Sequence, residues 1–178
     1  MIGALIGKVF EKEENKIYLN VNGVIYELVV SLNTLSNAKD GLYYVSEVIK
    51  ESEYTLYGFL EKKEKEFFES LVRINGVGPK SAIAICSAFS IEEFSEIVKR
   101  GDIDTLKKVP GIGIKSAKRI LVEFEAKESE DVDKLKAKKA LLALGFKKDE
   151  VNRALSKVNG SVEEMIKEGL KNLSKGVL

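Results

Sequence analysis

Hydrophobic and polar residues alternate through most of the first sixty positions of the chain. The alternation is clear in residues 17–21, 24–30 and 43–45, and it returns around 54–59. A period of two is typical of β-strands that bury one face. The pattern predicts about five short strands in residues 1–60.

Turn signals separate these expected strands. Asn22-Gly23 lies between two alternating runs and predicts a two-residue hairpin, while Asp40-Gly41 marks another turn. About five short strands in so small a domain favour a closed barrel of the OB type. We therefore expect residues 1–60 to form an OB-fold barrel.

Helical spacing of apolar residues replaces the alternation from residue 61 onward. Residues 61–126 predict a helical domain that is interrupted at Asn75–Gly78 and at Pro110–Gly113. Ser90 and Glu93 predict a capping box at the start of one of its helices. This change of period makes the chain a multi-domain β plus α protein.

A polar, acidic segment at residues 127–133 predicts a linker, with the frayed end of a helix as the alternative. Residues 134–178 then form a third unit. Helices are expected near 134–144, 149–157 and 161–173, the last opened by a capping box of Ser161 and Glu164. The third unit is therefore expected to be a small three-helix bundle.

The helical domain contains an internal repeat at an offset of 35 residues. Each copy has a helix, an apolar-Gly-apolar-Gly turn and a second helix that begins with Lys and Ser. The first copy includes Leu71, Ile74, Gly76, Val77, Gly78, Lys80, Ser81, Ala82 and Ile85, and the second Leu106, Val109, Gly111, Ile112, Gly113, Lys115, Ser116, Ala117 and Ile120.

Paired glycines at a helix start let a phosphate approach main-chain N–H groups, and neighbouring cations can contact the same backbone. Such contacts position a duplex without reading its sequence. The candidate DNA-binding residues are Gly76, Gly78, Lys80, Gly111, Gly113, Lys115, Lys118 and Arg119. A nucleotide-binding P-loop is rejected because the G-x-x-x-x-G-K spacing is missing.

Composition and charge narrow the function. The chain has no histidine and one cysteine, Cys86, which is expected to be a buried structural thiol, so a conventional hydrolase or metalloenzyme is not expected, nor any cofactor or metal. Net charge is +1, but residues 73–119 hold nine basic and five acidic residues. No segment has the pattern of a membrane span or signal peptide, and a cytoplasmic location is expected.

The two turns resemble a tandem helix-hairpin-helix pair, and their setting resembles the RuvA family of Holliday-junction-binding subunits. Met1-Ile2-Gly3, Leu56-Tyr57-Gly58-Phe59 and Ala143-Leu144-Gly145-Phe146 also look like that family. The resemblance covers essentially the whole chain. It implies an OB-fold barrel, a tandem helix-hairpin-helix domain and a UBA-like three-helix bundle.

The resemblance also implies a non-catalytic role in recombination and DNA repair. A homotetramer would hold a four-way junction open, with one tetramer or two on the DNA, and would recruit a RuvB-type hexameric ATPase for branch migration; a junction resolvase is a further partner it allows. Glu51, Ser52 and Glu53 match the family's acidic pin, although Ser52 stands where the family has a second carboxylate. Leu141, Leu144 and Phe146 match the ATPase-docking surface.

Two alternatives stay open at this point. The second turn also looks like the hairpin of DNA glycosylases with AP lyase activity, in which Lys115 would be the Schiff-base nucleophile and Asp133 the downstream acid. A generic DNA-binding module that binds single strands through the barrel is the other, but residues 1–60 hold eight acidic and only five basic residues.

Overall fold

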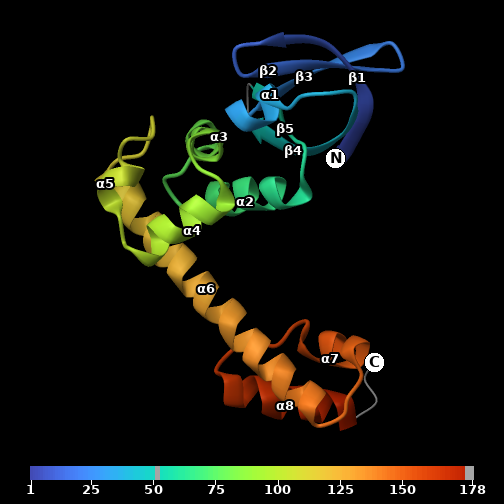
Figure 1. Ribbon diagram of the computed structural model, residues 1–178, viewed down its shortest axis with the longest axis vertical. Coiled ribbons are helices and arrows are strands. Elements are labelled where there is room, and N and C mark those ends of the chain that lie inside the picture. The colour runs from blue at the N-terminus through green and yellow to red at the C-terminus, as the bar shows by residue number, and fades with distance from the viewer. Residues whose placement is uncertain (51–52, 175–178) are drawn as a thin grey trace. The chain divides into compact units, whose positions relative to one another are not determined.

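The computed structural model describes residues 1–50 and 53–174 (Figure 1). The chain divides into two compact units, Met1–Leu121 and Val122–Leu178. The first unit contains the expected barrel and the expected hairpins, and the second contains a helical bundle. Among the helices described, none is long and apolar enough to cross a membrane.

Five strands close into a barrel in the order β1-β2-β3-β5-β4. Their bounds are β1 Ala4–Glu13, β2 Lys16–Val21, β3 Val24–Val30, β4 Gly41–Lys50 and β5 Glu53–Phe59. Asn22 and Gly23 both have positive φ, at 52° and 92°, as a tight hairpin between β2 and β3 requires. The expected OB-type barrel is thus confirmed.

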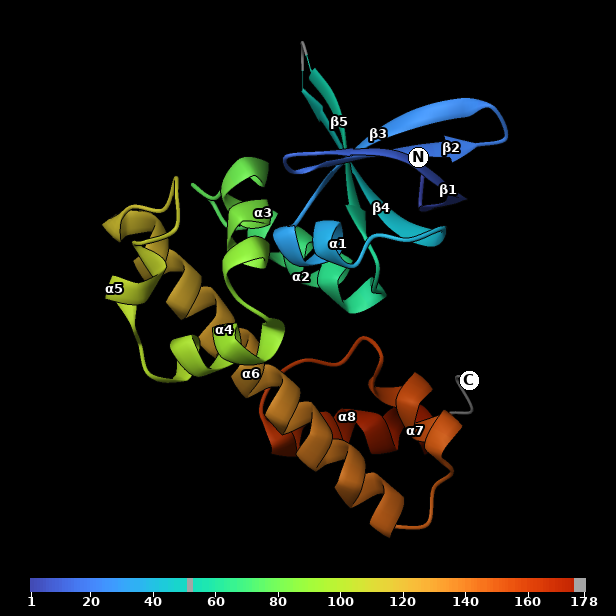
Figure 2. The ribbon, with the colours of Figure 1, turned by 45° about the horizontal axis from the view of Figure 1, so that its top comes forward.

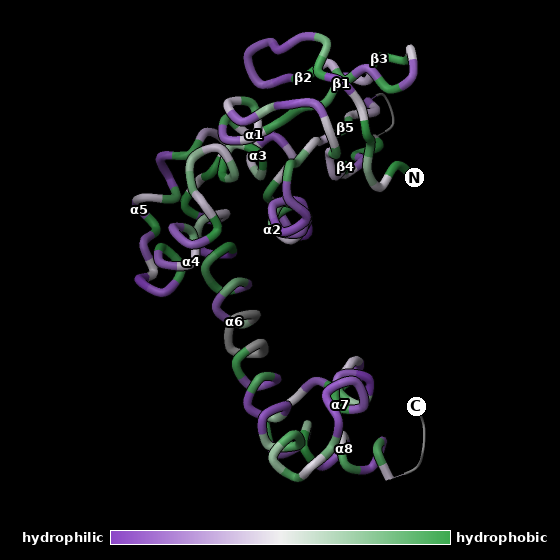
Figure 3. Tube along the Cα trace, turned by 45° about the vertical axis from the view of Figure 1, so that its right-hand side comes forward, coloured by the Kyte–Doolittle hydropathy of each residue, from purple (hydrophilic) through white to green (hydrophobic). Residues whose placement is uncertain are grey.

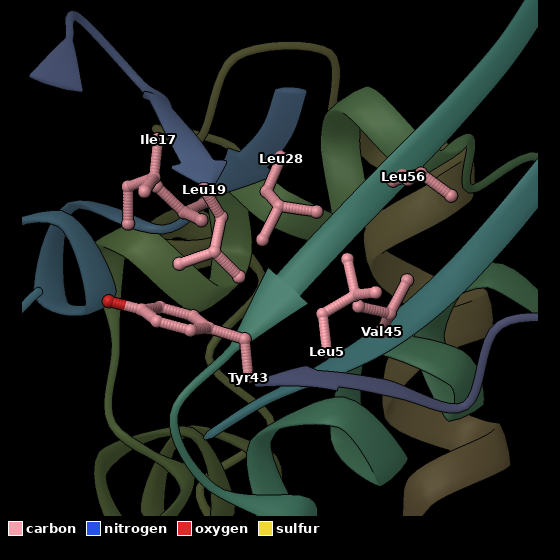
Figure 4. Close-up of a cluster of buried hydrophobic side chains, with 8 residues drawn as sticks. Leu5, Ile17, Leu19, Leu28, Tyr43, Val45 and Leu56 are labelled. Atoms are coloured by element: carbon pink, nitrogen blue, oxygen red, sulfur yellow. The ribbon is translucent and has the colours of Figure 1, made fainter. Parts of the chain in front are cut away.

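Alternate residues of the strands fill the barrel. Figure 4 shows Leu5, Ile17, Leu19, Leu28, Tyr43, Val45 and Leu56 as one buried cluster. Gly7 sits where β1 approaches β2, and a Cβ there would lie 2.5 Å from the backbone oxygen of Asn20. A glycine in this strand therefore permits the close approach of two backbones.

A short helix, α1 (Leu32–Ser36), follows β3 and was not predicted from the sequence. Ser31 caps it by accepting a hydrogen bond from the Thr34 amide. Glu64, on the helix α2 (Lys62–Val72), accepts hydrogen bonds from the hydroxyls of Ser31 (2.7 Å) and Thr34 (3.0 Å). These hydrogen bonds connect the segment that follows β3 to the helix α2.

The helices of the first unit are α2 (Lys62–Val72), α3 (Pro79–Ala88), α4 (Ile91–Lys99), α5 (Ile103–Leu106) and the start of α6 (Ile114–Ala143). Phe68 of α2 stacks on the barrel residue Tyr57, with ring centroids 4.7 Å apart, and packs at a tilt against Phe59, with centroids 5.1 Å apart. The change of secondary structure near residue 60 is therefore not a break in packing. The expected capping box of Ser90 and Glu93 is present at α4.

Cys86 of α3 is buried, as expected, and burial raises the pKa of its thiol. Figure 2 shows α3 beside α1. The Ser87 hydroxyl of α3 accepts a hydrogen bond from the Leu32 amide of α1 at 3.1 Å. The contact with α1 therefore helps to position α3.

The linker expected at residues 127–133 is wrong, because α6 runs from Ile114 to Ala143 as one helix through that segment. The sequence there contains Lys and Glu, which have high helix propensity, and neither Gly nor Pro to end the helix. The acidic composition therefore did not mark a break between elements. Compact packing divides the chain earlier, after Leu121.

The second unit is a bundle of the C-terminal part of α6, α7 (Lys148–Leu155) and α8 (Val162–Ser174). Its buried core contains Ala137, Leu141, Val151, Leu155, Val158 and Met165. Figure 3 shows hydrophobic and hydrophilic residues alternating along these helices, as expected for helices that bury one face. The Ser161–Glu164 capping box is present, and the expected three-helix bundle is confirmed.

Candidate nucleic-acid interface

The first hairpin, defined here as residues 74–81, joins α2 to α3. The Val77 amide donates to the Ile74 carbonyl (3.0 Å), and the Val77 side chain is buried. Gly76 has φ +89°, a conformation that L-residues rarely adopt. Gly78 then caps α3, and the Ala82 amide donates to its carbonyl at 2.9 Å.

The second hairpin, residues 109–116, repeats this arrangement between α5 and α6. The Ile112 amide donates to the Val109 carbonyl (3.1 Å), Ile112 is buried, and Gly111 has φ +80°. The Ala117 amide donates to the Gly113 carbonyl at 2.9 Å. The sequence repeat is therefore also a structural repeat, down to individual backbone hydrogen bonds.

The two hairpins are bonded to each other. The Ser81 hydroxyl donates to the Gly111 carbonyl (3.3 Å), and the Ser116 hydroxyl donates to the Gly76 carbonyl (3.1 Å). Arg119 Nη1 donates to the Asn75 carbonyl at 2.9 Å. Sequence reasoning missed the roles of both serines, although their equivalent places in the repeat were the available signal.

The outer surface of both hairpins is open. A Cβ added at Gly78 or at Gly113 would meet no atom within 4 Å, so another molecule can approach the backbone there. The first amides of α3 and α6 begin helices and have no acceptor within their own helix. Helix N-termini carry partial positive charge and bind anions such as phosphate.

The predicted cations lie in the hairpins and in the first turns of α6, close in sequence to the open glycines. The side chains of Lys80, Lys115, Lys118 and Arg119 are all exposed. Arg119 also forms a contact within the protein, because one of its five N–H donors bonds to the Asn75 carbonyl. The structure thus brings together, in one unit, the eight residues that the sequence singled out for DNA binding.

The other predicted sites are placed differently. Of the acidic pin, Glu51 and Ser52 lie outside the described residues, and Glu53 is exposed as the first residue of β5, opposite Lys50 of β4. Leu141 is completely buried in the core of the second unit, so it cannot contact a partner directly. Phe146 is half-buried against that core, and Leu144 is 62% exposed.

The lyase alternative gains nothing from the structure. Its acid, Asp133, forms an ion pair with Lys136 (Oδ1–Nζ 3.5 Å), and it belongs to the second compact unit. Lys115, the nucleophile this alternative requires, is an exposed side chain of the first unit.

Comparison with protein families decides between the remaining possibilities. The model of the RuvA N terminal domain matches residues 1–58, the model of the RuvA C-terminal domain matches residues 137–174, and a SAM-like helix-hairpin-helix tandem matches residues 68–126. A RuvA subunit from Nautilia profundicola is 51% identical over 183 residues, which cover 99% of this chain and 100% of the relative. The chain belongs to the RuvA family.

Other RuvA relatives match at similar coverage. The Holliday junction branch migration complex subunit RuvA of Nitratiruptor sp. is 42% identical over 98% of this chain and 100% of the relative. The RuvA subunit of Pseudomonas aeruginosa is 39% identical over 97% of this chain and 100% of the relative. The resemblance noted in the three sequence motifs therefore extends along the whole RuvA chain.

Proposed function

We propose that this chain is the Holliday-junction-binding subunit of a branch migration complex. One observation carries the proposal: two hairpins of the same geometry, each with an open glycine at a helix start, are hydrogen-bonded into one unit. In this arrangement both hairpins can contact the phosphate backbone of the same DNA duplex. The names of the relatives support the same role.

The proposed contacts are made to phosphates rather than to bases. Amides at the starts of α3 and α6 donate to phosphate oxygens, and Lys80, Lys115 and Lys118 supply positive charge around them. Contacts of this kind fix the position of a duplex but carry no sequence information. Binding is therefore expected to be sequence-tolerant and to weaken steeply with salt.

Four copies of the chain are proposed to surround the junction, with Glu51 and Glu53 near its centre, where carboxylates repel phosphates. The outer face of the barrel supports self-association. Ile6 is 72% exposed and is the cross-strand partner of Leu42, which is 41% exposed. Contiguous apolar surface on the outside of a protein marks a site that another protein covers, and this pair contributes to such a surface.

The second unit is proposed to dock a RuvB-type ATPase through Leu144 and Phe146, while this chain itself performs no catalysis. The burial of Leu141 limits it to supporting the other two residues. Leu144→Asp should abolish stimulation of the ATPase and leave junction binding unchanged. Leu135→Asp is the matched control, because Leu135 is 52% exposed on α6 but is not one of the three residues predicted to dock the ATPase.

Competition among labelled four-way junctions, linear duplexes and single strands tests the main proposal. The full-length protein should prefer the four-way junction whatever its sequence, and the preference should persist when the arms are changed. Equal affinity for linear duplex would contradict the proposal. Cleavage or borohydride trapping on an abasic duplex would instead support the lyase alternative.

A further inference from the structure

Ser81 and Ser116 form a reciprocal pair of bonds across the repeat. Ser81 belongs to the first copy and donates to a glycine of the second, while Ser116 belongs to the second copy and donates to the equivalent glycine of the first. Each residue is equivalent to the other at the 35-residue offset. Such exchange of equivalent contacts is characteristic of a twofold interface, here between two halves of one chain.

We propose that Ser81 and Ser116 are positioning residues that hold the two hairpins at a fixed spacing, so that both contact one DNA backbone as a single rigid unit. The contact with DNA in this proposal rests on the proposed function. The fixed spacing of the hairpins is a property of the protein alone. Neither serine needs to touch DNA. The serines act through the carbonyls of Gly76 and Gly111, which belong to the binding turns.

The glycines at the turns are suited to receive these bonds. A Cβ at Gly111 would lie 2.5 Å from Ser81 Oγ, so the hydroxyl occupies the space that any other residue would fill. A Cβ at Gly76 would lie 3.7 Å from Ser116 Oγ and 3.5 Å from Arg119 Nη1. The absence of a side chain at Gly111 therefore serves the contact between the hairpins as well as the backbone conformation, whereas at Gly76 it serves the backbone conformation.

The expected gain in affinity comes from fixing the two hairpins relative to each other before DNA binds. Two hairpins joined by flexible contacts would have to be aligned when the DNA binds, and the entropy lost in that alignment would weaken the complex. Hydrogen bonds between the hairpins remove part of this cost in advance. Because both bonds are exposed and longer than 3 Å, each is expected to contribute only modestly.

Affinity for a four-way junction tests the proposal through Ser81→Ala, Ser116→Ala and the double variant. Each single change should weaken binding about threefold and the double change about tenfold, as expected for the loss of one and two weak hydrogen bonds. Ser70→Ala is the matched control, since Ser70 donates to Phe67 within its own helix. The Ser81→Thr/Ser116→Thr variant keeps both hydroxyls and should retain wild-type affinity.

A distance measurement separates positioning from general destabilisation. Spin labels on Lys80→Cys and Lys115→Cys should give a narrow distance distribution, which should broaden when both serines are alanine; the buried Cys86 should not react. Unchanged junction affinity in the double serine variant, or weakened affinity with an unchanged distribution, overturns the proposal. A wild-type protein without junction preference would overturn the proposed function instead, because the distribution is measured without DNA.

Discussion

The two hairpins share one backbone but differ in what surrounds them. Thirty-five residues before Lys118 and Arg119, which are exposed on α6, the first copy has Ile83 and Ala84 on α3. Ile83 is only 6% exposed. The helical position of Lys118 is therefore core in the first copy and charged surface in the second.

The packing of α3 against α1 explains this difference. The helix α3 lies beside α1, and its Ser87 hydroxyl accepts a hydrogen bond from the Leu32 amide, so one part of α3 is covered. The corresponding part of α6 exposes Lys115, Lys118 and Arg119. The two copies thus share the backbone geometry proposed to bind phosphate. The first copy has the packing contacts with α1, and the second has most of the exposed positive charge.

Alanine at Gly111 should produce the largest difference between the copies. Left-handed backbone costs an ordinary residue roughly 1–2 kcal/mol, and both Gly76→Ala and Gly111→Ala carry that strain. Only the Cβ at 111 collides with Ser81 Oγ. Gly111→Ala should therefore lower the free energy of unfolding and the junction affinity more than Gly76→Ala does, as measured by chemical denaturation and competition gels.

The control for this comparison is Gly101→Ala. Gly101 has φ +62° with nothing within 4 Å of an added Cβ, and it lies outside both hairpins. It should lose stability through backbone strain, yet bind junctions normally. If Gly76→Ala impaired binding more than Gly111→Ala, the clash with Ser81 would not be the deciding contact.

Removal of lysines should reveal the unequal distribution of charge. The slope of log affinity against log salt falls by about one when a substitution removes one cation that neutralises a phosphate. Lys115→Ala/Lys118→Ala should therefore lower the slope by about two, and Lys80→Ala by about one. Equal slopes for the two variants would show that the copies contribute equally. Lys63→Ala, on α2 and outside both hairpins, is the matched control and should leave the slope unchanged.

Local signals explain how much of the fold was predictable. Alternation and the Asn22-Gly23 turn were sufficient for the barrel, and Ser161 with Glu164 marked a helix start, because each signal acts within a few residues. The helix α1 was missed because Glu64, about thirty positions away, accepts hydrogen bonds from its first turn. The linker at 127–133 was wrong because an acidic, polar composition is as compatible with a helix as with a linker.

In the candidate DNA-binding surface, too, local signals were predictable from the sequence and distant contacts were not. Repetition in the sequence identified the glycines and lysines of both hairpins, since a duplicated motif is visible without knowing any contact. The bonds from Ser81 and Ser116 depend on how the copies face each other, which the sequence does not specify. Leu141 was assigned to a docking surface by resemblance, but its complete burial became apparent only in the packed bundle.

The smallest predicted effect concerns the first helix of each copy. In the first copy, α2 packs on the barrel through Phe68, whereas α5 of the second copy is a four-residue helix that begins at the cap Asp102. Hydrogen bonds from the hydroxyl and then the amide of Thr105 lower the pKa of Asp102 below its usual 3.8. The second hairpin therefore follows a helix with a partly exposed, titratable cap, and the first does not.

A carboxyl with a lowered folded-state pKa stabilises the fold above its unfolded pKa, and this contribution is lost as the pH falls through the folded value. The thermal stability of wild type should therefore exceed that of Asp102→Ala at pH 7, and the difference should shrink below pH 3.8. Asn at position 102 can cap the helix but does not titrate. The difference in thermal stability between Asp102→Asn and Asp102→Ala should therefore stay constant with pH. Thermal unfolding from about pH 2.5 to 7 measures both differences, and a pH-independent advantage of wild type over Asp102→Ala would rule out the carboxylate as the source of this stability.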